Sequence, residues 1–362
     1  MMTSRAERLI SNATGLDAVV IVNGGEPFLD STFWYLTEQT SGSFEGAAAI
    51  VTKDGLTVLV STLEEETARS GMGEVAVYRD RSEKEKLIRE ALKGARRVGF
   101  NTGAASYASV TGFMKMAGDI EVVDATNSIA ATVSVKDEKE IAATREACRI
   151  SSTVAREIPE YLFEGVTEKE VAARMENRMR ELGGTGLAFE TIAAFGPNSS
   201  KPHHSPTDRR LGKGDTALFD FGTKYEMYCS DMTRTVFFGD PPDVLIRAYD
   251  VVRRAQLAGL EHYYDGAPAK DADIAARELI DSTEFKGRFI HSYGHGIGMD
   301  VHQAISVYPK SEQILRAGNV VSAEPGIYLP GVGGIRIEDT CLITRDGVEV
   351  LTDFDRGLTV IR

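Results

Sequence analysis

Four acidic residues and one histidine in the last 150 or so residues have the types and order expected of ligands for two divalent metal ions. They are Asp220, Asp231, His295, Glu324 and Glu338. Taken singly, each is typical of a solvated charge or a structural histidine. Asp220 and Glu338, however, follow runs rich in Ala, Leu, Phe or Ile, where an unpaired buried charge is costly. The series therefore indicates a site where cations neutralise the carboxylates.

The donor atoms also indicate which ions would bind. Carboxylate oxygens with one imidazole and no thiolate suit Mn²⁺, Co²⁺ or Zn²⁺ and disfavour copper or a structural zinc. Calcium prefers more oxygen ligands and no imidazole. Four carboxylates nearly balance two divalent charges, so a bridging hydroxide could act there as a nucleophile at neutral pH. We expect two divalent ions from the group of Mn²⁺, Co²⁺ and Zn²⁺.

Residues around the five ligands extend this site. Strand alternation places Arg336 and Glu338 on one face, and it places Asp231, Thr233 and Thr235 together on another. These polar faces would line one site. The glycines on either side of the histidine, in Gly294–Gly298, match no nucleotide-binding loop and predict close approach of the backbone to a metal or substrate.

The chain has six histidines, and two besides His295 are candidates for catalysis. His203 lies in a Pro-His-His loop, and His302 follows His295 by seven residues. An imidazole at either position can hydrogen-bond a carbonyl oxygen or relay a proton. For His203 the alternative is an exposed loop histidine with no role. Structural or supporting roles are expected for His204 and His291.

The N-terminal part alternates short β-like runs with helical stretches. Apolar runs at 18–22, 47–51, 56–60, 97–100 and 120–123 are separated by turn residues, which predicts a small α/β domain over 1–135. Ser82–Glu85 resembles a capping box that opens a helix to about Lys93. A long helix with a charged start at Lys136 marks the expected domain boundary.

The part from 136 to 362 shows one pattern twice. The helix from Lys136 and a second helix, from the capping box Thr167–Glu170 to Gly183, precede the strands of Asp220 and Asp231. Helices at about 243–264 and 271–282 precede the segments of the other three ligands. This order predicts an α+β domain with pseudo-twofold halves and the metals between them.

Composition excludes several classes of protein. A formal net charge of -13 opposes binding to nucleic acid or to an anionic membrane. Cys148, Cys229 and Cys341 are widely spaced and predict neither a disulfide framework nor a thiolate zinc site. The first residues lack the apolar stretch of a signal peptide. We therefore expect a cytoplasmic protein.

The series resembles the pita-bread metallopeptidase family in its proline-directed branch, which includes Xaa-Pro dipeptidase (prolidase) and aminopeptidase P. The segments that carry this resemblance are Asp220–Gly222, Tyr228–Thr235, Gly294–Gly298, Glu324–Tyr328 and Arg336–Asp339. The resemblance covers 136–362 as a pita-bread catalytic domain. The first 135 residues resemble a creatinase-type N-terminal domain. Their matching motifs, such as Phe33–Thr37, are less specific than those of the catalytic domain.

The resemblance implies a role for each ligand. Asp231 and Glu338 would bridge both metals, His295 and Glu324 would complete one site, and Asp220 would complete the other. Glu324 would also carry the proton, while a metal-bridging hydroxide attacks the scissile carbonyl.

The resemblance also implies substrate contacts and an activity. His203 and His302 would contact the carbonyl and the intermediate, and Tyr228 and Arg336 would contact the substrate. We expect hydrolysis of Xaa-Pro bonds, chiefly in dipeptides, by a homodimer. Alternatives are an aminopeptidase acting on longer Xaa-Pro peptides or on N-terminal methionine, and a binding protein of the same fold. The segment after His302 offers only Lys310 for a dipeptide carboxylate, which keeps the aminopeptidase alternative open.

Overall fold

The computed structural model describes residues 4–362 and separates into two compact units, Met1–Val133 and Ser134–Arg362. Residues 1–3, which belong to the expected N-terminal domain, lie outside the described part. The domain boundary expected between residues 135 and 136 stays a prediction. Within residues 4–362, no helix combines the length and the apolar character needed to cross a membrane.

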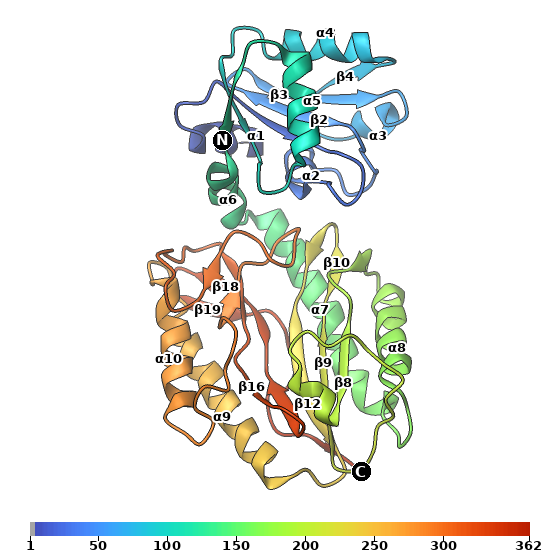
Figure 1. The fold of residues 1–362 in the computed structure, drawn as a ribbon, viewed down its shortest axis with the longest axis vertical. Helices are drawn as coiled ribbons and strands as arrows, with labels where there is room; N and C mark the ends of the chain where they lie inside the picture. Colours follow the sequence, from blue (N-terminus) through green and yellow to red (C-terminus); the bar gives the residue numbers. More distant parts are fainter. Residues whose placement is uncertain (1–3) are drawn as a thin grey trace. The chain divides into compact units, whose positions relative to one another are not determined.

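The first unit is the expected α/β domain. Its six strands form one sheet in the order β4-β3-β2-β1-β5-β6, and apolar side chains of the central strands pack under α4 and α5 (Figure 1). The strands are β1 (Ala18–Val22), β2 (Ala48–Thr52), β3 (Gly55–Ser61), β4 (Glu74–Tyr78), β5 (Arg97–Phe100) and β6 (Glu121–Asp124). The helices are α1 (Arg5–Asn12), α2 (Ser31–Thr37), α3 (Glu65–Ala68), α4 (Arg81–Ala91), α5 (Tyr107–Ala117) and α6 (Thr126–Ser134).

One predicted helix start in this unit is wrong. Helix α4 begins at Arg81, and its N-cap is Asp80, whose carboxylate accepts hydrogen bonds from the backbone N–H groups of Ser82 and Glu83. Ser82 therefore lies inside the first turn. Aspartate is as good an N-cap as serine, so two candidates two residues apart could not be separated by pattern alone.

The second unit contains the two helix pairs expected from the repeated pattern. The helices are α7 (Glu138–Tyr161), α8 (Glu168–Glu181), α9 (Asp243–Leu260) and α10 (Ala269–Asp281). Helices α7 and α8 begin at true capping boxes, with Asp137 and Thr167 as N-caps. Helix α9 ends at Leu260, four residues before the predicted end. Figure 1 shows α9 and α10 along one side of the strands and α7 and α8 along the other.

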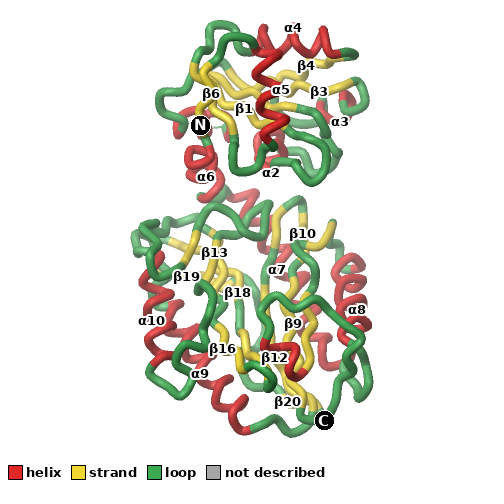
Figure 2. The backbone as a smooth tube through the Cα atoms, in the orientation of Figure 1, coloured by secondary structure: helices red, strands yellow, loops and turns green. Residues whose placement is uncertain are grey.

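The strands between these helices are short and form several small sheets, which the yellow segments of Figure 2 trace. Those of the first half are β7 (Gly186–Leu187), β8 (Ile192–Phe195), β9 (Asp215–Phe221), β10 (Thr223–Tyr225), β11 (Tyr228–Cys229) and β12 (Met232–Phe238), with a 3-10 turn at Gly196–Ser200. Those of the second half are β13 (Gly294–His295), β14 (Ser306–Val307), β15 (Val320–Ala323), β16 (Gly326–Leu329), β17 (Gly333–Arg336), β18 (Asp339–Thr344), β19 (Gly347–Val350) and β20 (Val360–Ile361).

Each half has its own hydrophobic core. One cluster joins α7 and α8 to β8 and β9, and another joins α9 and α10 to β15, β16 and β17. Polar residues that point away from these two cores meet between the halves, where burial must be offset by hydrogen bonds or ions. The pseudo-twofold arrangement expected from the sequence is therefore confirmed, and it defines where a site can form.

Candidate metal centre and active site

A cavity of about 550 Å³ in the second unit brings the predicted residues together. Its lining includes all five candidate ligands, together with His203, His302 and Arg336. Each ligand sits on or beside a strand end. Asp220 is on β9, Asp231 precedes β12, His295 ends β13, Glu324 follows β15, and Glu338 lies between β17 and β18. Strands far apart in the sequence thus converge on one cavity.

Three of the candidate ligands form the tightest cluster. Ligand atoms of Asp231, His295 and Glu338 all lie within 4.8 Å of one another. The Nε2 atom of His295 is 3.5 Å from a carboxylate oxygen of Asp231 and 3.2 Å from one of Glu324. One carboxylate oxygen each of Asp220 and Asp231 is buried without a hydrogen-bond partner. Unpaired buried oxygens beside an imidazole nitrogen fit the donor set of a divalent cation.

Electrostatics also favour a bound cation. Burial, and then the charges of nearby carboxylates, raise the pKa values of Asp231 and Glu338 well above their ordinary range. Burial likewise raises the pKa of Asp220, although the Arg336 guanidinium opposes this shift. Without a bound cation, ionisation of these buried carboxylates is unfavourable. Divalent cations would stabilise their charged form.

Glu324 behaves differently from the other acids. Burial disfavours its charged form, but the hydrogen bond and charge of His295 outweigh burial and lower the pKa of Glu324 to about 2. Ser322 also supports this pair, because its hydroxyl donates to Glu324 at 3.2 Å and accepts from the backbone N–H of His295 at 2.9 Å. The two side chains are held as a unit at the cavity wall.

Arg336 joins the site from its buried side. Its guanidinium donates to Asp220 at 2.6 Å, to the Thr233 hydroxyl at 3.0 Å and to the Tyr328 hydroxyl at 2.8 Å. Thr233 in turn donates to Glu338 at 2.6 Å. Asp231, Arg336 and Glu338 from the two predicted polar faces line the cavity, and Thr233 lies behind them as a hydrogen-bond partner of Arg336 and Glu338.

Besides His295, the cavity lining includes the histidines His203, His302 and His291. His203 is exposed on its loop at the cavity, and the His302 ring lies 4.2 Å from the His295 ring, measured between centroids. Burial and the charge of His295 lower the pKa of His302, so its imidazole is neutral at pH 7. His291 accompanies them at the wall, where its Nε2 is 2.8 Å from the Tyr328 hydroxyl.

The glycines beside His295 lie close against neighbouring main chain. A Cβ added at Gly296 would lie 1.9 Å from the carbonyl oxygen of Gln303, and one at Gly294 would lie 2.2 Å from that of Ser322. These glycines therefore allow close approach to neighbouring main chain, and their approach to a metal or substrate stays a prediction. The close approach to main chain packs the loop of His302 directly against the strand of His295.

Tyr228 lies apart from the cavity-lining residues. Its side chain is buried, and its hydroxyl donates to a carboxylate oxygen of Glu140 on α7 at 3.1 Å. Its role in substrate binding stays a prediction. Sequence reasoning assigned no role to Tyr328 or Ser322, because an isolated tyrosine or serine in a strand-like segment carries no local signal of its partners.

His204 has the structural role expected for it. It is buried, and its Nε2 lies 2.9 Å from the carboxylate of Glu168 at the start of α8. Glu168 also accepts from the backbone N–H groups of Phe195 and Thr207, both at 2.8 Å, and from the side chain of Asn198 at 3.0 Å. This carboxylate anchors the 195–207 loop, and with it His203, to the helix.

Glu168 should therefore make stability depend on pH. Burial alone would raise its pKa, but hydrogen bonds from Thr207, His204 and Phe195 more than offset burial and lower it. A lowered folded-state pKa contributes stability above the unfolded value of about 4.3 that is lost as pH falls through the folded value. We expect Glu168→Gln to destabilise the protein by about 2–3 kcal/mol at pH 7 and by less below pH ~4. Urea unfolding at both pH values checks this, and an equal difference at both would contradict it.

Two family models match the two parts of this chain. Residues 142–345 match the model of Metallopeptidase family M24, and residues 5–132 match that of the Creatinase/Prolidase N-terminal domain. An uncharacterized peptidase of Staphylococcus aureus is 35% identical over 314 residues, which are 85% of this chain and 88% of the relative.

Two solved structures are similar over nearly their whole length. The Xaa-Pro dipeptidase from Bacillus anthracis has a TM-score of 0.91 at 30% identity, covering 98% of this chain and 99% of that one. The X-Pro aminopeptidase from Thermotoga maritima has a TM-score of 0.89 at 31% identity, covering 99% of this chain and 100% of that one.

The fold and the cavity with its carboxylate and imidazole donors define a metallopeptidase of the pita-bread family. The chain belongs to Metallopeptidase family M24 and carries the N-terminal domain of creatinases and prolidases. Membership of this family implies divalent metal ions at the site.

Proposed function

We propose that this protein is a dinuclear metal-dependent exopeptidase that hydrolyses Xaa-Pro bonds, with dipeptides as its principal substrates. The observation that carries the proposal is the convergence of Asp220, Asp231, His295, Glu324 and Glu338 on one cavity, with two buried carboxylate oxygens that have no hydrogen-bond partner. The similarity to a Xaa-Pro dipeptidase over 98% of the chain supports the preference for proline.

These five residues would be the ligands of two metal ions. We assign Asp231 and Glu338 to both ions, His295 and Glu324 to one, and Asp220 to the other. Bound there, two divalent ions would activate water and polarise the scissile carbonyl. The oxygen-rich donor set with one nitrogen favours Mn or Co, with Zn as the alternative.

The chain's own residues would bind the substrate and move the proton. Glu324 would accept the proton of the attacking water and pass it to the proline nitrogen, since its carboxylate lies at the cavity wall. His203 and His302 would hydrogen-bond the carbonyl oxygen as charge develops on it. The Arg336 guanidinium already donates hydrogen bonds to Asp220, Thr233 and Tyr328. It would contact substrate only through its remaining N–H groups.

One observation favours a second candidate, an aminopeptidase that acts on longer Xaa-Pro peptides. A dipeptide presents its free carboxylate inside the cavity, where burial demands a positively charged partner. Among the residues that line the cavity, Arg336 is the one with a permanent positive charge, and its guanidinium is already paired with Asp220 at 2.6 Å. A longer peptide carries its carboxylate farther from the scissile bond and needs no such partner.

A panel of peptides and metals tests the proposal and separates the candidates. Metal-stripped protein should be inactive, and Mn²⁺ or Co²⁺ should restore cleavage of Met-Pro, measured as free proline. Faster cleavage of Ala-Pro-Ala would establish the aminopeptidase instead. Methionine released from Met-Ala-Ser would indicate a methionine aminopeptidase. Bound metal without any turnover would reject the proposal in favour of a binding protein of this fold.

The setting of the enzyme is also a proposal. We place it in the cytoplasm, which is supported by three buried cysteines, all in the free thiol form. We expect a homodimer by resemblance to the family, and sedimentation equilibrium would measure this. The net charge of -13 supports peptides, rather than nucleic acid or anionic membrane, as the partner.

A further inference from the structure

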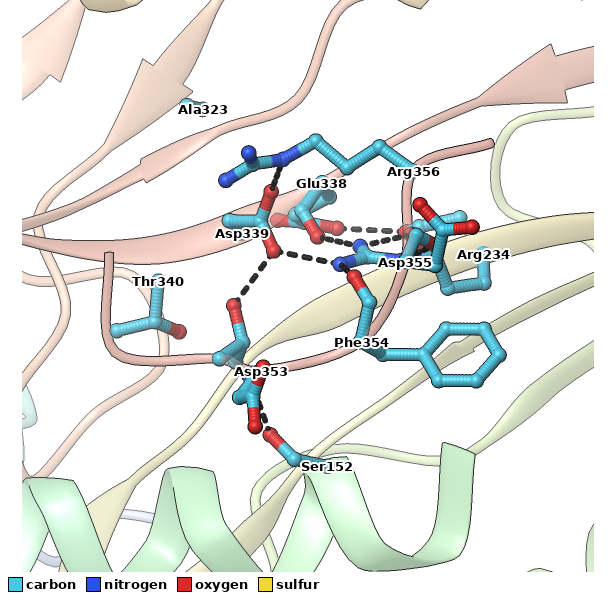
Figure 3. A network of polar contacts seen from close by, with 12 residues as sticks. Ser152, Arg234, Ala323, Glu338, Asp339, Thr340, Asp353, Phe354, Asp355 and Arg356 are labelled. Atoms are coloured by element: carbon cyan, nitrogen blue, oxygen red, sulfur yellow. Dashed lines mark hydrogen bonds and ion pairs between the residues drawn. The ribbon is translucent and has the colours of Figure 1, made fainter. Parts of the chain in front are cut away.

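A buried network of charged groups lies directly behind the candidate ligand Glu338 (Figure 3). Its centre is Asp339, the next residue in the chain, which is fully buried and does not line the cavity. Because adjacent side chains of an extended chain point in opposite directions, Glu338 faces the cavity while Asp339 faces away. Whatever holds Asp339 therefore also holds the main chain of Glu338.

Four donors hold the Asp339 carboxylate. They are Arg234 at 2.7 Å, Thr352 at 2.7 Å, Gln256 at 2.9 Å and Arg356 at 2.6 Å. The first two reach one oxygen and the last two the other. Both oxygens are thus fixed, and the carboxylate has a single orientation.

Two of these donors also form hydrogen bonds with main-chain carbonyl oxygens at or beside candidate ligands. Arg234 donates to the carbonyl oxygen of Glu338 itself at 2.5 Å. Gln256, on α9, donates to the carbonyl oxygen of Ala323 at 3.1 Å, and the next residue is Glu324. Ala323 and Asp339 are also direct partners in the pairing of β15 with β18. The network therefore sets the separation between the main chains of Glu324 and Glu338.

The C-terminal segment completes the network from outside. Thr352 and Arg356 supply two of the four donors, and the carbonyl oxygens of Phe354 and Asp355 accept from Arg234 at 2.7 and 3.2 Å. Of the two arginines bound to Asp339, Arg356 is the more accessible, with its side chain 28% exposed, whereas that of Arg234 is 1% exposed. It can be changed without opening the centre of the network.

We infer that Arg356 is a positioning residue for the metal centre. Through Asp339 and the residues bound to it, Arg356 fixes the main chain on which Glu324 and Glu338 are carried, although it touches neither side chain. Without Arg356, one Asp339 oxygen keeps only Gln256, and the carboxylate can turn toward the water that enters the vacated space. The inference rests on the proposed function, because it takes Glu324 and Glu338 as metal ligands.

Metal binding by the full chain tests this inference. Metal-stripped wild type, Arg356→Met and Arg356→Lys are titrated with Co²⁺ alone and followed by visible absorption, which reports the coordination geometry. We expect Arg356→Met to bind Co²⁺ about 10–100-fold more weakly, with an altered spectrum, as is typical when a group that orients a ligand is removed. Arg356→Lys keeps the charge and should fall between Arg356→Met and wild type.

Two reference variants make the outcomes distinct. Arg247→Met removes a matched arginine, ion-paired with Glu284 at 2.7 Å on the surface, and should bind Co²⁺ like wild type. Glu338→Gln should lose at least one ion. All titrations are run below the melting temperature of each variant, and if Arg356→Met does not fold, Arg356→Lys must still bind more weakly than wild type.

The results separate this inference from the proposal beneath it. Unchanged Co²⁺ affinity in Arg356→Met, or in Arg356→Lys where only that variant folds, would overturn the inference, even with a lower melting temperature. An equal loss in Arg247→Met would overturn it too. Failure of the wild type to bind two ions, or two ions bound by Glu338→Gln as tightly as by wild type, would instead reject the proposed metal centre.

Discussion

Replacing Glu338 with glutamine is expected to abolish peptide hydrolysis and, at the same time, to raise the melting temperature of the metal-free protein. Activity should fall below about 1% of wild type, because losing a direct ligand exceeds the 10–100-fold effect of losing a group behind it. Stability should rise, because burial and the charges of Glu324 and Asp220 disfavour the ionised form of Glu338 and raise its pKa. Glutamine has the same shape, no charge, and an oxygen for the Thr233 hydroxyl.

The opposite signs of the two effects make this prediction specific. About 1 kcal/mol of relieved repulsion would raise the melting temperature by about 2–4 °C in a domain of this size. Calorimetry of metal-stripped protein and a Met-Pro assay with added Mn²⁺ measure the two effects. With metal, the order should reverse, since binding stabilises the wild type. The exposed Glu312, changed to glutamine, is the control and should alter neither quantity. Substantial activity in Glu338→Gln, or a clear drop in its metal-free melting temperature, would contradict the assignment.

The neighbouring histidines His203 and His204 should respond in opposite ways to the same substitution. His203→Ala is expected to lower kcat by about 10²-fold or more, the usual contribution of a positioned proton donor, while the metal content stays at the wild-type level. Its side chain is exposed at the cavity, so the loss should cost little stability. Steady-state kinetics and metal analysis of the same preparations measure this effect. If metal content fell in parallel with kcat, His203 would be a ligand instead.

His204→Ala serves as the matched control. His204 is buried against Glu168, so its loss leaves that carboxylate with one donor fewer and should lower stability by about 1–3 kcal/mol. The kcat of the folded protein should change much less than in His203→Ala. A comparable fall in kcat in both variants would mean that the loop acts as a whole and that His203 has no separate role.

Local patterns in the sequence predicted the elements that carry the site. Apolar runs located all five predicted strands of the N-terminal unit, and the predicted capping box at Thr167 marks a true helix start. The error at Ser82 arose where two good caps lie two residues apart. These signals are local, because helix capping and strand alternation depend on neighbours only a few residues away.

The identities of the candidate ligands could also be read from the sequence. A carboxylate after an apolar run needs a counter-charge wherever the chain folds, so Asp220 and Glu338 stood out before any contact was known. Strand alternation likewise predicted that Thr233 and Asp231 lie on the same face. In the structure, the Thr233 hydroxyl donates a hydrogen bond to Glu338 of the opposite half. The types of these residues and their order in the chain therefore predicted the candidate metal ligands.

Tertiary structure alone decided which groups support that chemistry. Tyr328 links His291 to Arg336, and Asp339 joins Arg234 to the C-terminal segment, through contacts between residues as many as 105 positions apart. No local pattern encodes the pair of Arg234 and Asp339, because it depends on how the two halves pack. The sequence by itself determined the elements and the donors, since these follow from local propensity and from the cost of burying charge, and the resemblance of its motifs indicated the family. The hydrogen bonds that orient those donors exist only once distant strands meet.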